Sequence, residues 1–253
     1  MSTYPQHHDG RRALVTGAAS GIGRAAAIKL AEAGARVLAV DLNAEGLEAL
    51  ASEVRNIEPV TCDLSDLDAL RALPKDVDIL VNNAGIQTVS PIEDFPVERF
   101  ELIMRVMLHA PWYLIRQTIP HMYEKGWGRI VNLSSAHGLR ASEFKSAYVT
   151  AKHGLEGLSK VAALEGAPHG VNSVTVNPAY VRTPLVEKQI ADQARTHGIS
   201  EDEVVSKIML DRVHVKRLIE PEEVGELVLF LTGPASASMS GTSYAIDGAW
   251  TAY

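Results

Sequence analysis

The feature that most constrains the fold is an apolar run that leads through closely spaced glycines into an alanine-rich segment. Residues 12–16 (RALVT) have the apolar character of a buried strand. Gly17, Gly21 and Gly23 follow, and residues 24–33 favour a helix. Such glycines let the backbone approach a pyrophosphate, and the helix start offers unpaired N–H groups and a positive dipole end. Strand, glycine turn and helix in this order predict a dinucleotide-binding unit.

Strand-like runs alternate with helical segments along the rest of the chain. The expected strands are residues 12–16, 36–40, 59–63, 77–81, 129–133, 171–176 and 241–246. This alternation implies right-handed βαβ crossovers, and hence a parallel sheet with helices on both faces. Ligands bind beyond the carboxyl ends of such strands. The residues at those ends are Gly17, Asp41, Asp63, Asn82 and Ser135.

The expected helices include one long segment and one excursion. Residues 97–125 form a helical segment that Pro111 and Pro120 should kink or break. The other helices are expected over residues 24–33, 65–73, about 148–168 and 220–231. Residues 180–211 are polar and helical without a place in the sheet, which is typical of a substrate lid.

Composition excludes several classes of protein. With 253 residues and 46% hydrophobic residues, the chain suits one α/β domain over residues 11–253 that follows a flexible tail, residues 1–10. A net charge of -7 without a basic block argues against nucleic acid. Cys62 is the only cysteine, and no clustered His, Asp or Glu pattern predicts a metal site. No run of about 18 apolar residues suggests a membrane span, and we expect a cytoplasmic protein.

Ser135, Tyr148 and Lys152 form a candidate acid–base cluster. Tyr148 and Lys152 are four residues apart and therefore share a helix face. An ammonium about 4 Å from the phenol is worth about 4 kcal/mol at an effective dielectric of 20, enough to lower a pKa of about 10 toward neutrality. Ser135 lies close enough in sequence to hydrogen-bond the oxygen that loses its proton. An ordinary amphipathic helix start is the alternative for Tyr-x-x-x-Lys taken alone.

Asp41, which ends the second expected strand, bears on the choice of nucleotide. An acidic residue 18 positions after Gly23 suits a bidentate grip on the adenosine ribose hydroxyls and repels a 2′-phosphate. Ser20 stands where a basic residue would favour NADP. NAD is therefore the expected cofactor.

These motifs together resemble the short-chain dehydrogenase/reductase family. They are Thr16-Gly-x-x-x-Gly-x-Gly23, Asn82-Asn-Ala-Gly85, Ser135 and Tyr148-x-x-x-Lys152, and the resemblance covers about residues 12–253. It implies a Rossmann-type, doubly wound parallel sheet of about seven strands in the order 3-2-1-4-5-6-7, with a small helical lid. It also implies hydride transfer between NAD and a carbinol carbon, and a homotetramer.

The resemblance assigns roles to individual residues. Tyr148 is the acid/base, Ser135 orients the substrate oxygen, and Lys152 lowers the Tyr148 pKa and holds the nicotinamide ribose. The implied cofactor-binding residues are Gly17, Ser20, Gly21, Ile22, Gly23, Asp41, Asp63, Leu64, Asn83, Ala84, Gly85, Tyr148, Lys152, Pro178, Val181 and Thr183.

Within the family, the sequence is similar to bacterial enzymes that oxidise (R)-3-hydroxybutyrate to acetoacetate. The similar pieces include NAGIQ (residues 83–87), SSAHGL (134–139) and TPLVEKQI (183–190). The implied substrate-binding residues are Gln87, Ser135, His137, Lys145, Tyr148, Tyr180 and Gln189. This set offers several donors and at least one positive charge for a small carboxylate. Tyr180 stands where Trp is usual.

One departure from the family leaves other functions open. Met107 aligns with a position where an Asn usually supports a proton-relay water, and a thioether cannot make the hydrogen bonds of an amide. A catalytically impaired, nucleotide-binding regulatory protein is therefore one alternative. Another is a family dehydrogenase for a different small hydroxy acid, a secondary alcohol or a sugar.

Overall fold

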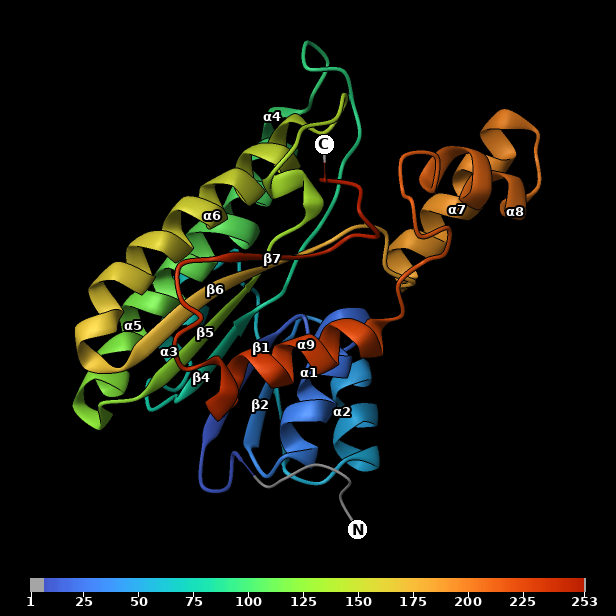
Figure 1. Ribbon diagram of the computed structural model, residues 1–253. Coiled ribbons are helices and arrows are strands. Elements are labelled where there is room, and N and C mark those ends of the chain that lie inside the picture. The colour runs from blue at the N-terminus through green and yellow to red at the C-terminus, as the bar shows by residue number, and fades with distance from the viewer. Residues whose placement is uncertain (1–6, 253) are drawn as a thin grey trace.

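A sheet of seven parallel strands forms the centre of the computed structural model, which describes residues 7–252 apart from the side chains of residues 192 and 196. Its order is β3-β2-β1-β4-β5-β6-β7 (Figure 1). The strands are β1 (Arg12–Thr16), β2 (Arg36–Asp41), β3 (Ile57–Thr61), β4 (Ile79–Asn82), β5 (Gly128–Leu133), β6 (Val171–Pro178) and β7 (Ser243–Ile246). The predicted fold class and strand order are confirmed.

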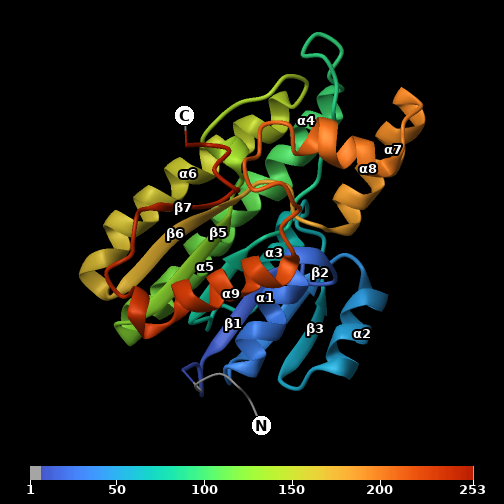
Figure 2. The same cartoon turned by 45° about the vertical axis from the view of Figure 1, so that its right-hand side comes forward.

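Helices cover both faces of the sheet (Figure 2). One face carries α1 (Gly21–Glu32), α2 (Ala44–Glu53) and α9 (Pro221–Thr232), and the other carries α3 (Leu67–Ala72), α4 (Val97–Met104), α5 (Ala110–Lys125) and α6 (Ser146–Gly166). Successive side chains of a strand point to opposite faces, so Val15 packs in the first layer and Leu14 in the second. Burial on both faces explains why the central strands β1 and β4 are largely apolar.

Strand β3 begins and ends two residues earlier than predicted. Its register pairs Val37 with Ile57 and Asp41 with Thr61, so pairing with β2 ends before Asp63. Pro59 is tolerated because β3 lies at the edge of the sheet, where a missing N–H leaves no neighbouring strand unpaired.

The long helical segment does not break at either proline. A π-helical turn, Arg105–His109, joins α4 to α5, and Pro111 is the second residue after it. Pro120 lies inside α5 without ending it. The predicted irregularity is therefore a wider turn just before Pro111, which lacks the N–H that a regular helix needs there.

One residue of the tail predicted over residues 1–10, His8, is packed against the domain, whereas residues 7, 9 and 10 are exposed and residues 1–6 lie outside the described residues. His8 is 1% exposed. Its backbone N–H donates to the Ala33 carbonyl at 3.0 Å, and its Nε2 lies 3.1 Å from Thr232 Oγ1. Burial lowers the pKa of His8 to about 4. The packed chain therefore begins earlier than the sequence suggested.

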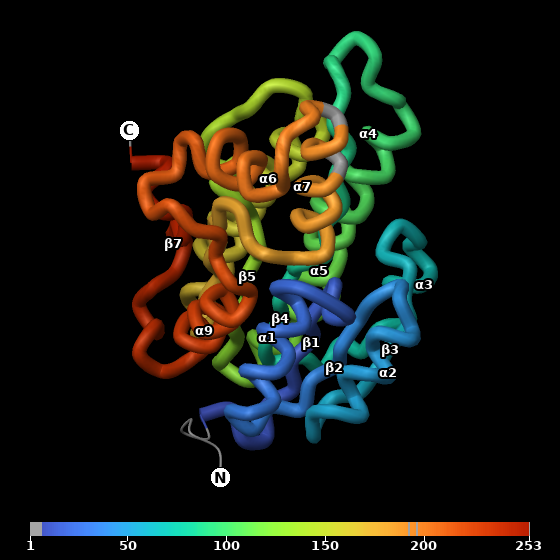
Figure 3. The backbone as a smooth tube through the Cα atoms, turned by 90° about the vertical axis from the view of Figure 1, so that its right-hand side faces the viewer, coloured from blue at the N-terminus to red at the C-terminus, as the bar shows by residue number. Residues whose placement is uncertain are grey.

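Residues 180–211 project from the carboxyl edge of the sheet, beyond the start of α1 (Figure 3). They contain α7 (Pro184–His197), α8 (Glu201–Val204) and a π-helical turn, Val205–Met209. This segment shares a small core with the residues that follow it, made of Ile190, Val204, Met209, Leu210, Val213 and Leu218. Its packing is largely separate from that of the sheet layers.

Candidate active site

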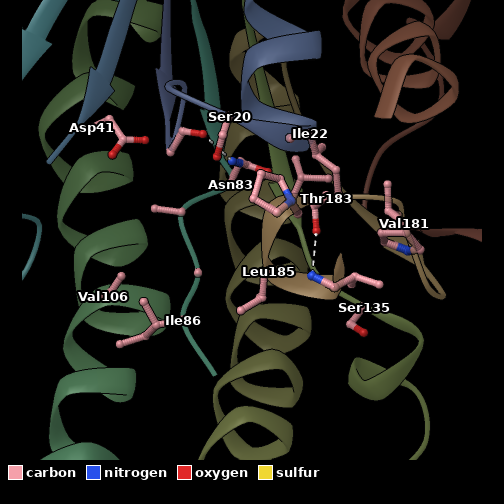
Figure 4. A pocket seen from close by; sticks show the side chains of 18 of the residues that line it. Ser20, Ile22, Asp41, Asn83, Ile86, Val106, Ser135, Val181, Thr183 and Leu185 are labelled. Atoms are coloured by element: carbon pink, nitrogen blue, oxygen red, sulfur yellow. Dashed lines mark hydrogen bonds between the residues drawn. The ribbon is translucent and has the colours of Figure 1, made fainter. Parts of the chain in front are cut away.

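A cavity of about 430 Å³ lies where the strands meet the helix starts (Figure 4). Apart from Gly23, every residue that the sequence assigned to the cofactor lines it. Side chains that the sequence did not single out also line it, among them Leu42, Cys62, Ile86, Val106, Leu185 and Val186. Of the residues predicted at the strand ends, Gly17, Asp41, Asp63 and Ser135 line this cavity, whereas Asn82 is buried and donates its amide to Asn132 Oδ1 at 2.9 Å.

Gly23 acts from beneath the cavity instead of lining it. A Cβ atom there would lie 2.1 Å from the Gly17 carbonyl oxygen and 2.4 Å from Asn83 Nδ2. The Asn83 amide donates to the carbonyls of Thr16 at 2.9 Å and Gly17 at 3.2 Å. Only glycine permits this approach, which ties the glycine turn to the end of β4.

The start of α1 is open to an anionic group. Gly21 and Ile22 line the cavity, and the N-cap residue Ser20 makes no side-chain cap with the helix. The first-turn N–H groups and the positive end of the helix dipole therefore remain for a ligand. The cradle fits the pyrophosphate of a nicotinamide dinucleotide.

Two carboxylates mark one end of the cavity. Asp41 accepts hydrogen bonds from the N–H groups of Ala19 and Asn43, both at 3.0 Å. Asp63 accepts from the Ser65 N–H and hydroxyl at 2.8 and 2.7 Å. Among the described residues that line the cavity, the only Lys or Arg is Lys152.

Ser135, Tyr148 and Lys152 meet at the other end of the same cavity. Ser135 follows β5, and its Oγ accepts the His137 N–H at 3.1 Å. Tyr148 lies in the first turn of α6 and Lys152 one turn later, with Nζ 5.6 Å from the centre of the Tyr148 ring. Lys152 Nζ donates to the Leu133 carbonyl. The structure therefore brings together the three residues of the predicted cluster.

Protonation in this cluster differs from the expectation for Tyr148. Burial raises the pKa of Tyr148, while a hydrogen bond with Ser135 lowers it. Burial also lowers the pKa of Lys152 to about 8, against an opposing effect of Glu156. Lys152, whose ammonium is itself desolvated and bonded to the Leu133 carbonyl, does not offset this effect of burial on the Tyr148 pKa.

A second cavity, of about 870 Å³, lies beside the first and under α7. His137, Lys145, Tyr180 and Gln189, which the sequence assigned to the substrate, all line it. The rings of His137 and Tyr148, with centres 6.1 Å apart, stand between the two cavities.

Gln87 is the exception among the predicted substrate residues, because it lines neither cavity. Its Oε1 accepts the N–H of Thr88 at 3.1 Å. This bond leaves the amide nitrogen, the donor that a carboxylate needs, unaffected, so the assignment of Gln87 to the substrate stays a prediction.

Lys145 is a half-buried cation in the second cavity. Its Nζ lies 3.5 Å from His137 Nε2 and 5.9 Å from the centre of the Tyr180 ring. Over the described chain, it has no carboxylate within ion-pair distance. Burial lowers the pKa of Lys145 and, together with the charge of Lys145, lowers that of His137 to about 3. A neutral imidazole beside an unpaired ammonium suits an anionic ligand.

Trp250 completes this wall of the second cavity. Its ring centre lies 4.9 Å from that of His137. Sequence reasoning gave Trp250 no role in the site, although its position next to Asp247-Gly248 was a usable signal. His137 also bonds Ser142 Oγ at 2.8 Å through Nε2, so this imidazole is held on two sides.

Met107 lies in the π-helical turn and contacts the loop after β4. Its sulfur accepts the Ile86 N–H at 3.5 Å, and its methyl group would lie 3.6 Å from a Cβ on Gly85. The thioether thus accepts one hydrogen bond, but it has no donor to offer.

The family model for short chain dehydrogenases matches residues 11–194. The chain belongs to the short-chain dehydrogenase family. This dehydrogenase is 46% identical to a D-beta-hydroxybutyrate dehydrogenase of Rhizobium meliloti, over 96% of this chain and 99% of the relative. A protein of the same name from Cupriavidus necator is 40% identical, with the same coverage of both chains. A solved structure of a proposed 2-deoxy-D-gluconate 3-dehydrogenase from Agrobacterium tumefaciens, with NADP bound, has a TM-score of 0.87 and 32% identity, over 99% of this chain and all of the other.

Neither a metal site nor a membrane span is found in the described part of the dehydrogenase. Within residues 7–252, apart from side chains 192 and 196, no three His, Cys, Asp or Glu side chains gather closely enough to hold a metal ion. Within that same part of the chain, no helix has the length and apolarity that a bilayer span requires.

Proposed function

We propose that this dehydrogenase catalyses the NAD-dependent, reversible oxidation of (R)-3-hydroxybutyrate to acetoacetate. The observation that carries the proposal is the unpaired Lys145 ammonium beside the neutral His137, across the Tyr148 ring from the first cavity. A substrate carboxylate bound there would place the C3 hydroxyl of the acid on the side of the Tyr148 ring. The names of the Rhizobium and Cupriavidus relatives support the same substrate.

The residues of the chain account for the proton in this reaction. Tyr148 takes the hydroxyl proton of the substrate, and Ser135, already bonded to Tyr148, orients the substrate oxygen. The bound nicotinamide supplies the acceptor for the hydride from C3. Lys152, when charged, stabilises the Tyr148 phenolate electrostatically. Reduction of acetoacetate runs the same transfers in reverse.

Two carboxylates support NAD over NADP. Asp41 and Asp63 lie at the end of the cavity away from Lys152, where no Lys or Arg among the described lining residues is placed to bind a 2′-phosphate. A phosphate there meets like charges, which costs binding free energy. A pair of ribose hydroxyls instead finds a carboxylate acceptor in Asp41.

Residues 180–211 serve as a lid in this proposal. Gln189, in α7, lines the second cavity together with Lys145. Closure of α7 brings the Gln189 amide to the carboxylate and excludes water from the reacting groups. By family analogy, we also propose that the dehydrogenase assembles as a homotetramer.

The test is NADH formation from NAD with (R)-3-hydroxybutyrate, run beside the (S) enantiomer, lactate, malate and an uncharged secondary alcohol. We expect turnover of the (R) acid to exceed that of the others. An uncharged alcohol that is oxidised with equal kcat/KM would remove the carboxylate site from the proposal. No turnover of any acid, with NADH still bound, would favour the impaired regulatory protein.

A further inference from the structure

A buried carboxylate lies beneath the acid–base cluster. Glu156 is 6% exposed and follows Lys152 by one helical turn in α6. Residues four apart lie on the same face of a helix, with about 5–6 Å between their Cβ atoms. Tyr148, Lys152 and Glu156 therefore form one row along α6, directed toward β6 and the catalytic end of the first cavity.

Three side chains from the sheet hold this carboxylate. Thr175 and Ser243 each donate a hydroxyl to Oε2 at 2.7 Å, and Asn177 donates its amide to Oε1 at 2.6 Å. Glu156 is thus held at both carboxylate oxygens by side chains of β6 and β7.

The same network reaches the catalytic serine. Besides bonding Glu156, the Asn177 amide donates to the Ser135 carbonyl at 3.0 Å. Ser134, the residue before Ser135, also lies close to this network. A Cβ atom added to Gly138 would lie 2.3 Å from Ser134 Oγ and 2.8 Å from Glu156 Oε1. The position of the Ser135 backbone is therefore tied to the position of the carboxylate.

Of the charged and titratable groups that are described near Lys152, Glu156 is the acidic one that acts on it. Tyr148 lies beside it in α6, His137 faces the Tyr148 ring from the turn after β5, and Tyr180 acts on Tyr148 from beyond β6. Lys145, at the start of α6, faces His137. Among the described residues, Glu156 is the one charged group that shifts the pKa of Lys152, and it raises that pKa against the effect of burial.

We propose that Glu156 is a positioning residue that keeps Lys152 protonated and, through Asn177, fixes the backbone of Ser135. The inference rests on the proposed function only in giving Lys152 and Ser135 their catalytic tasks. A purely structural role, in which Glu156 only joins α6 to β6 and β7, predicts lost stability without any change in Lys152. The two roles therefore differ in a measurable way.

The direct test is the ionisation of Lys152 in Glu156→Gln, a nearly isosteric variant that removes the charge. The lysine ¹³Cε signal is followed by NMR against pH, with Lys152→Met to assign it. We expect the titration midpoint to fall by about one pH unit relative to the parent enzyme. In the active enzyme, the alkaline limb of the kcat/KM profile should move to lower pH by the same amount, because Lys152 then loses its proton earlier.

Ser243→Ala is the matched control, because it removes one hydrogen bond to Glu156 and keeps the charge. A folded Glu156→Gln protein with an unchanged midpoint, or an equal shift in Ser243→Ala, overturns the proposal. If Glu156→Gln does not fold, Glu156→Asp, which withdraws the carboxylate, should give a smaller shift in the same direction, and no shift overturns it. The NMR titration needs no substrate, so a wrong substrate assignment would not affect it.

Discussion

Replacing Lys145 by methionine removes the positive charge that the proposed function gives to the substrate carboxylate. Methionine keeps most of the length of the side chain, so packing against Tyr180 is largely retained. A hydrogen bond to a charged group contributes about 1.5–3 kcal/mol, and its loss should raise KM for (R)-3-hydroxybutyrate about 10- to 150-fold. The effect on kcat should be smaller, because Lys145 lies across His137 from Tyr148 and does not touch the reacting carbon.

The assay is initial-rate NADH formation over a range of acid concentrations, with Lys160→Met as control, since Lys160 is an exposed lysine on the same helix. Oxidation of an uncharged secondary alcohol should not change in Lys145→Met. In the parent enzyme, KM for the acid should rise as pH increases through the Lys145 pKa, which burial has lowered, because only the ammonium binds the carboxylate. A KM within twofold of the parent value in Lys145→Met would refute the assignment of the carboxylate site.

Three other changes test different parts of the site. Asp41→Asn should raise the kcat/KM ratio of NADP to NAD at least about tenfold, measured by initial rates with each nucleotide, and an unchanged ratio would show that Asp41 does not exclude the phosphate. Tyr148→Phe should lower kcat by a factor of about 10² to 10⁴, while NADH affinity measured by fluorescence is retained; full activity would assign the proton transfer to another group. Met107→Leu should lower the free energy of unfolding in urea by about 1 kcal/mol or more, because the Ile86 N–H loses its acceptor. The control is Met122→Leu, at a fully buried methionine away from the cavity. An equal loss of unfolding free energy in Met122→Leu would show that the hydrogen bond to the Met107 sulfur does not contribute to stability.

The nucleotide cradle and the acid–base cluster were predictable because a parallel sheet brings the carboxyl ends of its strands to one edge. Once the strands were recognised, Gly17, Asp41 and Ser135 had to lie near one another. Tyr148 and Lys152 could be added to the predicted site because residues four apart lie on the same face of a helix. Local patterns and one topological rule were enough for these residues.

The features that sequence reasoning missed depend on contacts between distant residues. His8 is buried against Thr232, which lies 224 residues later. Glu156 reads as an ordinary helix residue until Ser243, 87 residues away, supplies a donor. The Lys152 ionisation likewise depends on burial, which no spacing rule measures.

The pairing of α1 with α9 has a consequence for how the protein is made. Gly225 packs so closely on α1 that a Cβ there would lie 3.1 Å from the Ala25 backbone. The helix that begins the nucleotide cradle is therefore covered by a segment that leaves the ribosome long after it. Until residue 232 has been synthesised, the face of α1 that α9 covers remains exposed to water. The glycine turn is translated early relative to α9, but as a packed structure it is completed only once α9 is available.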